Sequence, residues 1–367
     1  IDATDELHWT RRLHNWNYMC ADCHSTGYRK GYDAPNDTFD STFSDIDVSC
    51  EACHGPGSRH VALARAERLG EDSGLLLSFA DPERRWVRAA GEPNARLAGE
   101  NHSAVQVEAC GRCHARRAPL RAEYAHGQPL TDSYRPALLT EPLYFPDGQI
   151  RDEVYVYGSF LQSKMHAAGV VCTDCHEPHS VRLKIEGDGL CAQCHSPEVF
   201  AAADHHRHPE ADAPACVDCH MPSRNYMVID GRRDHSFRVP RPDLAASLGV
   251  TDACAACHAD QPAGWSATVV REWLGRDASG YQQFAEAFRA AETGAADAAE
   301  RLAVLLESGD LSPIARATAL RHLSNYASPV SFDLASAALK DPDPLVRLGA
   351  LEATAPLSVA TKQARLL

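Results

Sequence analysis

Cysteine and histidine recur in this 367-residue chain in one fixed pattern, Cys-x-x-Cys-His. The pattern occurs seven times and uses all 14 cysteines. The cysteine pairs are Cys20/Cys23, Cys50/Cys53, Cys110/Cys113, Cys172/Cys175, Cys191/Cys194, Cys216/Cys219 and Cys254/Cys257. The histidines that follow them are His24, His54, His114, His176, His195, His220 and His258. Two thiols at this spacing can form thioether bonds to the two vinyl groups of one haem, and the next residue then lies under the iron as its proximal ligand. The motifs therefore predict seven covalently attached haems c.

Other uses of paired cysteines fit the pattern less well. Zinc ribbons contain Cys-x-x-Cys pairs but do not require a histidine after each pair. Redox pairs of the thioredoxin type occur once or twice, within a βαβ pattern that this sequence lacks. Disulfide bonds would not need seven histidines. Covalent haem attachment in bacteria takes place outside the cytoplasmic membrane, so the motifs predict a periplasmic or extracellular protein.

The second axial position of each iron decides between an electron carrier and an enzyme. An iron with two histidine ligands exchanges one electron, whereas an iron with an open position can bind a substrate. Twelve of the 19 histidines remain after the proximal ones. Eight of these are predicted distal ligands: His8, His60, His102, His166, His179, His205, His208 and His235. The supply allows two histidines on every iron.

The positions of these histidines restrict their partners. His60 follows His54 by six residues, a tether too short to reach the opposite face of the same haem. We therefore expect His60 to serve a neighbouring haem, and the same reasoning applies to His179, which follows His176 by three. His205 and His208 would share one face if they lay on a helix. Arginines near the motifs are predicted partners of haem propionates: Arg112, Arg116, Arg117, Arg224, Arg232 and Arg233.

The elements that position the motifs must be short, because seven haems share residues 20–258. The predicted fold is mainly α with many loops, a multihaem cytochrome c wrapped around stacked haems. We predict a helix over Ser58–Leu69, a short strand over Val154–Tyr157 and a helix from Ser159. The brief spacers between the fourth, fifth and sixth motifs predict that their haems lie in close contact.

The chain changes character after the last motif. Apolar residues there recur at helical spacing and predict helices over Ala295–Leu306, Pro313–Tyr326, Ser331–Leu339 and Pro344–Ala353. Residues 341–351 resemble the second helix of a HEAT-like repeat, which predicts a C-terminal α-solenoid of the HEAT or TPR type; a plain helical bundle is the alternative. The predicted domains are a multihaem region at 1–262, a helical connector at 263–295 and incomplete repeats at 296–367.

Several segments beyond the motifs resemble bacterial multihaem cytochromes c of the cytochrome c-554-like group. They are Asn15–Thr26 (NWNYMCADCHST), Asp47–His60 (DVSCEACHGPGSRH), Val154–Met165 (VYVYGSFLQSKM), His220–Pro222 (HMP) and Asp234–Pro240 (DHSFRVP). The likeness covers about residues 5–260. It implies extracytoplasmic electron transfer and, in many members, C-terminal HEAT or TPR-like repeats. Relatives usually carry one more haem motif upstream, so a further N-terminal haem segment is expected to be missing.

Three functions stay open from the sequence. The first is an electron-transfer protein whose haems form a wire between redox proteins that act as donor and acceptor. The second is an oxidoreductase acting on a nitrogen or sulfur oxyanion at one open haem. The third is a protomer of a haem-wire filament or membrane complex, assembled through the C-terminal repeats. Many related nitrite reductases have lysine in place of the motif histidine, and no Cys-x-x-Cys-Lys occurs here, which favours the carrier.

Charge and hydropathy exclude other classes. The net charge of −14 argues against nucleic acid or an anionic membrane surface as partner. No apolar run reaches 18 residues, so no transmembrane segment is predicted.

Overall fold

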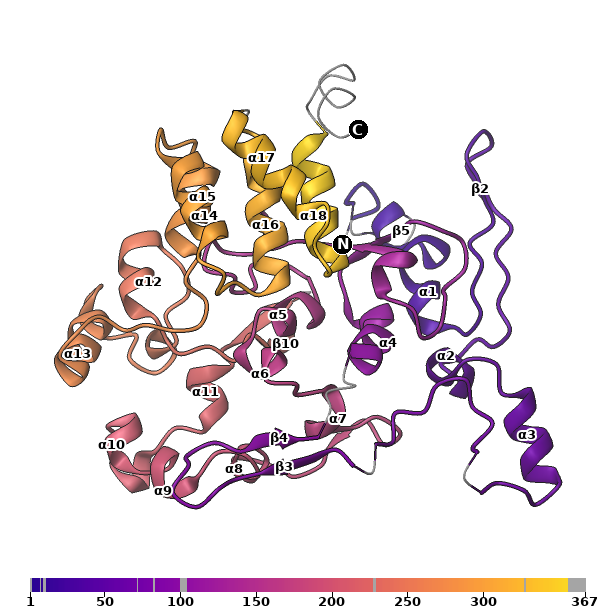
Figure 1. The fold of residues 1–367 in the computed structure, drawn as a ribbon, viewed down its shortest axis with the longest axis horizontal. Helices are drawn as coiled ribbons and strands as arrows, with labels where there is room; N and C mark the ends of the chain where they lie inside the picture. The colour runs from indigo at the N-terminus through magenta and orange to yellow at the C-terminus, as the bar shows by residue number, and fades with distance from the viewer. Residues whose placement is uncertain are drawn as a thin grey trace. The chain divides into compact units, whose positions relative to one another are not determined.

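The computed structural model describes residues 2–6, 8, 11–70, 72–81, 83–99, 104–226, 229–326 and 328–355 (Figure 1). The chain forms two compact units. The first comprises residues 1–82 and 102–136 and holds motifs one to three; the second comprises 83–101 and 137–367 and holds motifs four to seven. These units do not follow the predicted boundaries at 262 and 295, which separate motif-bearing from motif-free sequence and stay a prediction.

The first unit consists of short elements joined by loops. Its helical elements are η1 Arg12–His14, η2 Trp16–Cys20 (a π-helical turn), α1 Ala21–His24, α2 Cys50–His54, α3 Ser58–Arg65, α4 Ala104–His114 and η3 Leu130–Asp132. Its strands form two antiparallel pairs, β1 Tyr32–Asp33 with β2 Thr38–Phe39 and β5 Arg117–Pro119 with β6 Tyr134–Pro136. Helix α3 confirms the predicted helix at its start but ends before Leu69. Glu67 adopts a φ of 56°, a left-handed conformation that stops the helix.

The second unit begins with a separate hairpin, β3 Arg85–Val87 paired with β4 Arg96–Ala98. Its other strand pairs are β7 His176–Glu177 with β8 Arg182–Leu183 and β9 Ser223–Tyr226 with β10 Asp230–Arg233. Its helical elements up to residue 274 are α5 Tyr157–Leu161, α6 Lys164–Ala167, α7 Cys172–Cys175, α8 Gly189–Ala192, α9 Pro197–Phe200, α10 Ala203–His206, η4 Glu210–Asp212, α11 Cys216–His220, α12 Pro242–Leu248, η5 Cys254–Ala256 and α13 Trp265–Leu274.

The predicted strand over Val154–Tyr157 is wrong. Tyr155 has a φ of 59°, which interrupts an extended segment. The helix α5 then starts at Tyr157, two residues earlier than predicted. Five consecutive residues of α5 are buried, so the apolar run serves a short core helix.

Five helices follow, coloured orange to yellow in Figure 1: α14 Ala285–Thr293, α15 Ala298–Glu307, α16 Pro313–Leu323, α17 Pro329–Ala338 and α18 Pro344–Thr354. The last four confirm the four predicted helices. Proline occupies the first turn of α16, α17 and α18, where its missing N–H needs no partner. Helix α18 packs on α16 around Leu320, Val346 and Ala350.

The helical end shares a core with the motif-bearing part of the second unit. Helix α16 packs on α5. The Leu139 N–H donates to Thr318 Oγ1 at 3.1 Å, and both residues are fully buried. The side chain of Ile314, also fully buried, lies close to Gly158 of α5. The C-terminal helices are therefore joined to the segment 137–163 by packing as well as by the chain.

Candidate haem-binding sites

Each motif lies on a short helical turn or at its end. Residues three and four apart share one face of a helix, so the two thiols and the imidazole of a motif are brought to the same side. Motifs two and six fill α2 and α11, and motif three ends α4. None of the fourteen cysteines, all of which lie in the described part of the chain, forms a disulfide bond. This arrangement fits thioether attachment of one planar group per turn.

Motifs five and seven run past their helical elements: α8 ends at Ala192, before Cys194 and His195, and motif seven does the same at Cys257. The 3-10 turn η5 ends at Ala256, so Cys257 lies just beyond the helical element that carries Cys254. Its N–H still donates to the Cys254 carbonyl oxygen at 3.2 Å, which keeps the two thiols on one turn. Cys257 is exposed, whereas Cys254 is half-buried. A short 3-10 turn at the surface thus leaves the second thiol of motif seven open to solvent.

The same exposure occurs at motif two, where Cys50 and Cys53 are both exposed. The other eleven motif cysteines are half-buried. An exposed thiol on a turn is accessible to the vinyl group of a haem, so the assignment of Cys50, Cys53 and Cys257 to thioether bonds stays a prediction.

Three motif histidines face a predicted distal histidine. The rings of His176 and His235 have centroids 6.4 Å apart and planes 24° apart. For His205 and His220 the values are 6.0 Å and 19°. For His208 and His258 they are 6.0 Å and 32°.

These separations fit an iron between the rings. A metal-bound imidazole nitrogen lies about 2 Å from the metal and about 1.1 Å from its own ring centre, so two imidazoles on opposite sides of one iron have centroids about 6 Å apart. Rings in van der Waals contact would lie much closer. Helix α10 ends at His206, and Arg207 adopts a φ of 59°. His205 and His208 therefore do not share a helical face but approach two different motifs.

Hydrogen bonds select the nitrogen that could meet a metal. Nδ1–H of His54 donates to the Leu77 carbonyl oxygen at 2.8 Å, and that of His220 donates to the Arg238 carbonyl oxygen at 2.8 Å. Four further rings donate from Nδ1 in the same way: His60 to Ser73 O (2.6 Å), His195 to Asn94 Oδ1 (2.6 Å), His208 to His206 O (2.5 Å) and His235 to Arg233 O (3.0 Å). A carbonyl oxygen can only accept, so Nδ1 carries the proton and Nε2 keeps its lone pair for a metal.

Burial favours the neutral imidazole. It lowers the pKa of His166 and His176, and burial followed by the charge of His220 lowers the pKa of His195 and His205. Only the neutral ring can coordinate a metal. These histidines are therefore held in the ligand form.

The remaining predicted distal histidines lie in different surroundings. The ring of His166 packs edge-on against Phe160 at 5.3 Å. The His179 side chain is 82% exposed and its Nδ1 lies 3.1 Å from Glu177 Oε1. His60 is held by Ser73, and His8 lies in the N-terminal segment with its N–H bonded to Asp5 O. His102 lies outside the described residues.

Neighbouring motifs lie against each other within each unit. In the first, Cys23 Sγ lies 3.8 Å from the Cys113 carbonyl oxygen, and Cys113 Sγ lies 4.0 Å from the Cys23 carbonyl oxygen. In the second, burial and then the charges of Asp174, Cys191 and Cys194 raise the pKa of the Cys175 thiol to about 11. The approach of motif one to motif three was not predicted, because they are separated by the whole of motif two.

The thiols of motifs five to seven continue this series. Burial and then the charge of Cys191 raise the pKa of Cys216 to about 12. Burial, then Asp218, and more weakly Cys257 of motif seven raise the pKa of Cys219. The Cys216 N–H also donates to Asp188 Oδ1 at 3.0 Å, which ties motif six to the start of α8. The protein segments of motifs four to six therefore lie close together, and the close contact of their haems stays a prediction.

Several arginines proposed for haem propionates have partners within the protein. Arg117 pairs with Asp22 at 2.7 Å and lies over the Tyr134 ring. Arg232 pairs with Glu153 at 2.9 Å, and Arg233 with Asp218 at 3.1 Å. Arg112 is buried and donates to the Ala52 carbonyl oxygen at 3.0 Å, which joins motif three to motif two. These arginines hold the motif segments together, a role that the sequence analysis missed.

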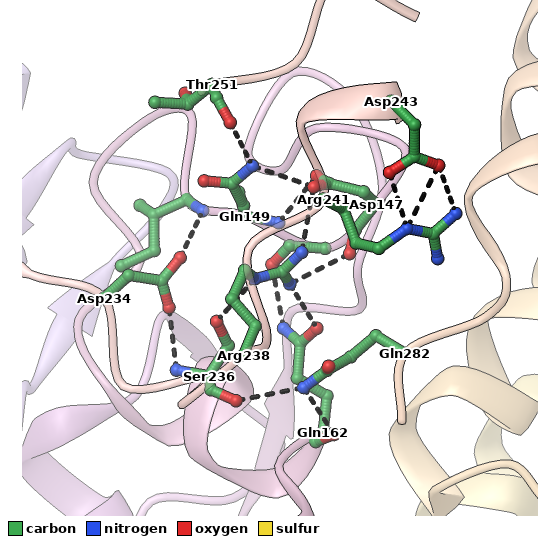
Figure 2. Close-up of polar contacts among 12 residues, drawn as sticks. Asp147, Gln149, Gln162, Asp234, Ser236, Arg238, Arg241, Asp243, Thr251 and Gln282 are labelled. Atoms are coloured by element: carbon green, nitrogen blue, oxygen red, sulfur yellow. Dashed lines mark hydrogen bonds and ion pairs between the residues drawn. The ribbon is translucent and has the colours of Figure 1, made fainter. Parts of the chain in front are cut away.

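A buried polar cluster supports the segment that carries His235 (Figure 2). Arg238 Nη1 donates to Asp147 Oδ2 at 2.8 Å, and Nη2 donates to the Asp147 carbonyl oxygen at 2.9 Å. Asp234 accepts from the N–H groups of Ile150 (3.1 Å) and Ser236 (2.8 Å). Segment 234–238 thus fixes both His235 and the carbonyl that accepts from His220. The sequence offered one signal, the charged residues on either side of His235.

A haem at each motif would also account for exposed surface. Large apolar side chains next to motif one are exposed, among them Trp16, Tyr18 and Met19. Apolar planar groups lying on the chain would cover surface of this kind. Among the described residues, no three His, Cys, Asp or Glu side chains gather as a zinc site would require.

Comparisons with known proteins agree with this chemistry. The family described as "Cytochrome c554 and c-prime" matches residues 3–55, which hold motifs one and two. The family described as "Doubled CXXCH motif" matches residues 165–200, which hold motifs four and five. This chain is a multihaem c-type cytochrome. Its distal ligands, and a haem on every motif, are proposals taken up below.

Two further comparisons concern solved structures and curated proteins. The solved "Outer Cell Wall Cytochrome OcwA" aligns with a TM-score of 0.48 and 16% identity, over 92% of this chain and 75% of that chain. No curated protein matches the chain. Within the part of the chain that the structure describes, no helix has the length and apolar character to cross a membrane.

Proposed function

We propose that this cytochrome carries seven haems c, mostly with two histidine ligands, and transfers electrons along them. The observation that carries the proposal is the set of three proximal–distal imidazole pairs with centroids 6.0–6.4 Å apart. On this proposal His235, His205 and His208 serve the haems of motifs four, six and seven. Each haem supplies a one-electron iron couple when bound.

The protein contributes three things to this transfer. The cysteines would fix each haem to its motif segment, so the distance between neighbouring haems would stay constant. The described Nδ1 hydrogen bonds keep six of the imidazoles neutral and aimed through Nε2, those of His54, His60, His195, His208, His220 and His235. The contacts between neighbouring motifs within each unit keep successive carriers at short range.

The proposal extends to location and partners. Thioether attachment is the reason to propose a location outside the cytoplasmic membrane, in the periplasm or at the cell exterior. The proposed donor and acceptor are other redox proteins. The C-terminal helices, which we assign to a HEAT or TPR-like solenoid, offer a surface for docking a partner or a second copy.

Mass spectrometry and EPR test the proposal. The intact chain should carry the mass of seven haems, and the ferric EPR spectrum should be dominated by low-spin signals of bis-histidine iron. Two haems or fewer would refute it. A strong high-spin signal that shifts with nitrite, hydroxylamine or cyanide would instead identify an oxidoreductase with an open iron.

A further inference from the structure

The β3–β4 hairpin, far from the fourth and fifth motifs in sequence, contacts both of them. At its start, Arg84 forms a bidentate ion pair with Asp174 inside motif four, with distances of 2.5 and 2.8 Å. Trp86 Nε1–H donates to the same carboxylate at 3.2 Å. The side chains of Arg84 and Asp174 are only 11% and 19% exposed. This end of the hairpin is therefore anchored to motif four.

The other end of the hairpin meets motif five. Asn94 pairs with His195 in an isolated antiparallel bridge. The Ala95 N–H donates to the Cys194 carbonyl oxygen at 2.7 Å, and the Ser196 N–H donates to the Pro93 carbonyl oxygen at 2.8 Å. These two backbone bonds hold Asn94 opposite His195, and its Oδ1 accepts from His195 Nδ1 at 2.6 Å.

This acceptor differs from those of the other motif histidines with a described Nδ1 bond. His54 and His220 donate to backbone carbonyl oxygens. The acceptor strength of a backbone carbonyl changes little when the side chain of its residue is substituted. His195 donates to a side chain. The electron density that an imidazole gives to its metal rises with the strength of the acceptor on its other nitrogen.

We propose that Asn94 is a positioning residue that sets the orientation and basicity of His195, and thereby the reduction potential of the fifth haem. The inference rests on the proposed function, because it needs a haem on Cys191 and Cys194. A stronger acceptor gives the imidazole more anionic character, which stabilises ferric iron and lowers the potential. Loss of the acceptor has the opposite effect.

Two nearly isosteric substitutions test the proposal in the full-length haem-loaded protein. Asn94→Asp should move one component of a spectroscopic redox titration to lower potential, and Asn94→Leu should move one component to higher potential. The EPR signal of one low-spin centre should change in both variants. Asn325→Asp, which adds the same charge in the exposed turn after α16, is the matched control and should leave the titration unchanged.

Opposite shifts are the decisive result, because a purely structural role predicts shifts of one sign or none. Potential shifts of the same sign in the two variants, or no shift in either of them, would overturn the proposal. If Asn94→Leu does not fold, Asn94→Asp decides alone: a shift to lower potential supports the proposal and an unchanged titration overturns it. The mass of the peptide with Cys191 and Cys194 distinguishes failure of the proposed function from failure of the role proposed for Asn94. A peptide without haem refutes the proposed function at this motif, whereas a haem-bearing peptide with unmoved potentials refutes only the role of Asn94.

Discussion

Replacement of Arg238 by methionine should destabilise the second unit strongly. The guanidinium is 6% exposed and faces the Asp147 carboxylate, which is 1% exposed, at 2.8 Å. Methionine fills part of the volume but leaves that carboxylate buried. Among the described residues, its remaining hydrogen bonds then come from the backbone and side-chain N–H groups of Gln149. Removal of one partner from a buried ion pair costs about 3–5 kcal/mol, since the other charge stays desolvated. We therefore expect the free energy of unfolding to fall by about 3 kcal/mol or more.

The assay is guanidinium unfolding followed by far-UV circular dichroism, with the haems still attached. Arg271→Met is the matched control. Arg271 pairs with Asp277 at 2.6 Å, but these side chains are 62% and 63% exposed, so its loss should cost less than about 1 kcal/mol. The double variant Arg238→Met/Asp147→Leu should recover part of the stability, because it removes the stranded charge. A single Arg238→Met variant as stable as the control would refute this reading of the cluster.

Three further predictions concern single side chains. His235→Ala should create one high-spin ferric centre, seen by EPR, at the haem of motif four, whereas His322→Gln should leave the spectrum low-spin. Burial lowers the pKa of His322 to about 4. As the pH falls below about 6.5, the unfolded state therefore binds a proton that the folded state does not, and the free energy of unfolding of the wild type should drop by about 2 kcal/mol between pH 7 and pH 5. Guanidinium unfolding of the His322→Gln variant should lack this component. Gly349→Ala should melt at a clearly lower temperature, because its Cβ would lie 2.4 Å from the Ala317 carbonyl oxygen between α18 and α16; Gly70→Ala, which meets nothing within 4 Å, should be close to neutral.

The chemistry of this protein could be predicted from the sequence because it depends on local spacing. Two cysteines and a histidine within five residues define an attachment site whatever surrounds them. The C-terminal helices were predictable for the same reason, since apolar periodicity and proline at the first turn are local signals. The strand predicted at Val154–Tyr157 failed because Tyr155 adopts a left-handed turn that β-propensity cannot reveal. The motif does not predict the burial of its thiols either, since Cys254 and Cys257 belong to one motif yet differ in exposure.

The pairing of histidines could not be predicted, since it depends on how distant segments approach. His205 and His208 look equivalent in the sequence, separated by only two residues. One left-handed residue, Arg207, turns the chain between them, so that His205 approaches His220 and His208 approaches His258. A single local backbone angle thus decides whether these neighbouring histidines approach one motif or two.

The same limit explains why the supporting residues were missed. Asn94, Asp147 and Arg238 lie in polar stretches that resemble solvated surface when read along the chain. Asp147 and Arg238 become buried only because the loops around residues 147 and 236 meet, and Asn94 meets His195 only through the hairpin. In a protein whose motifs are nearly identical, such residues are what can make one haem differ from the next. We therefore expect the order of reduction potentials along the chain to follow the acceptors and charges behind each imidazole, and substitutions in the supporting residues to reorder the potentials without loss of any haem.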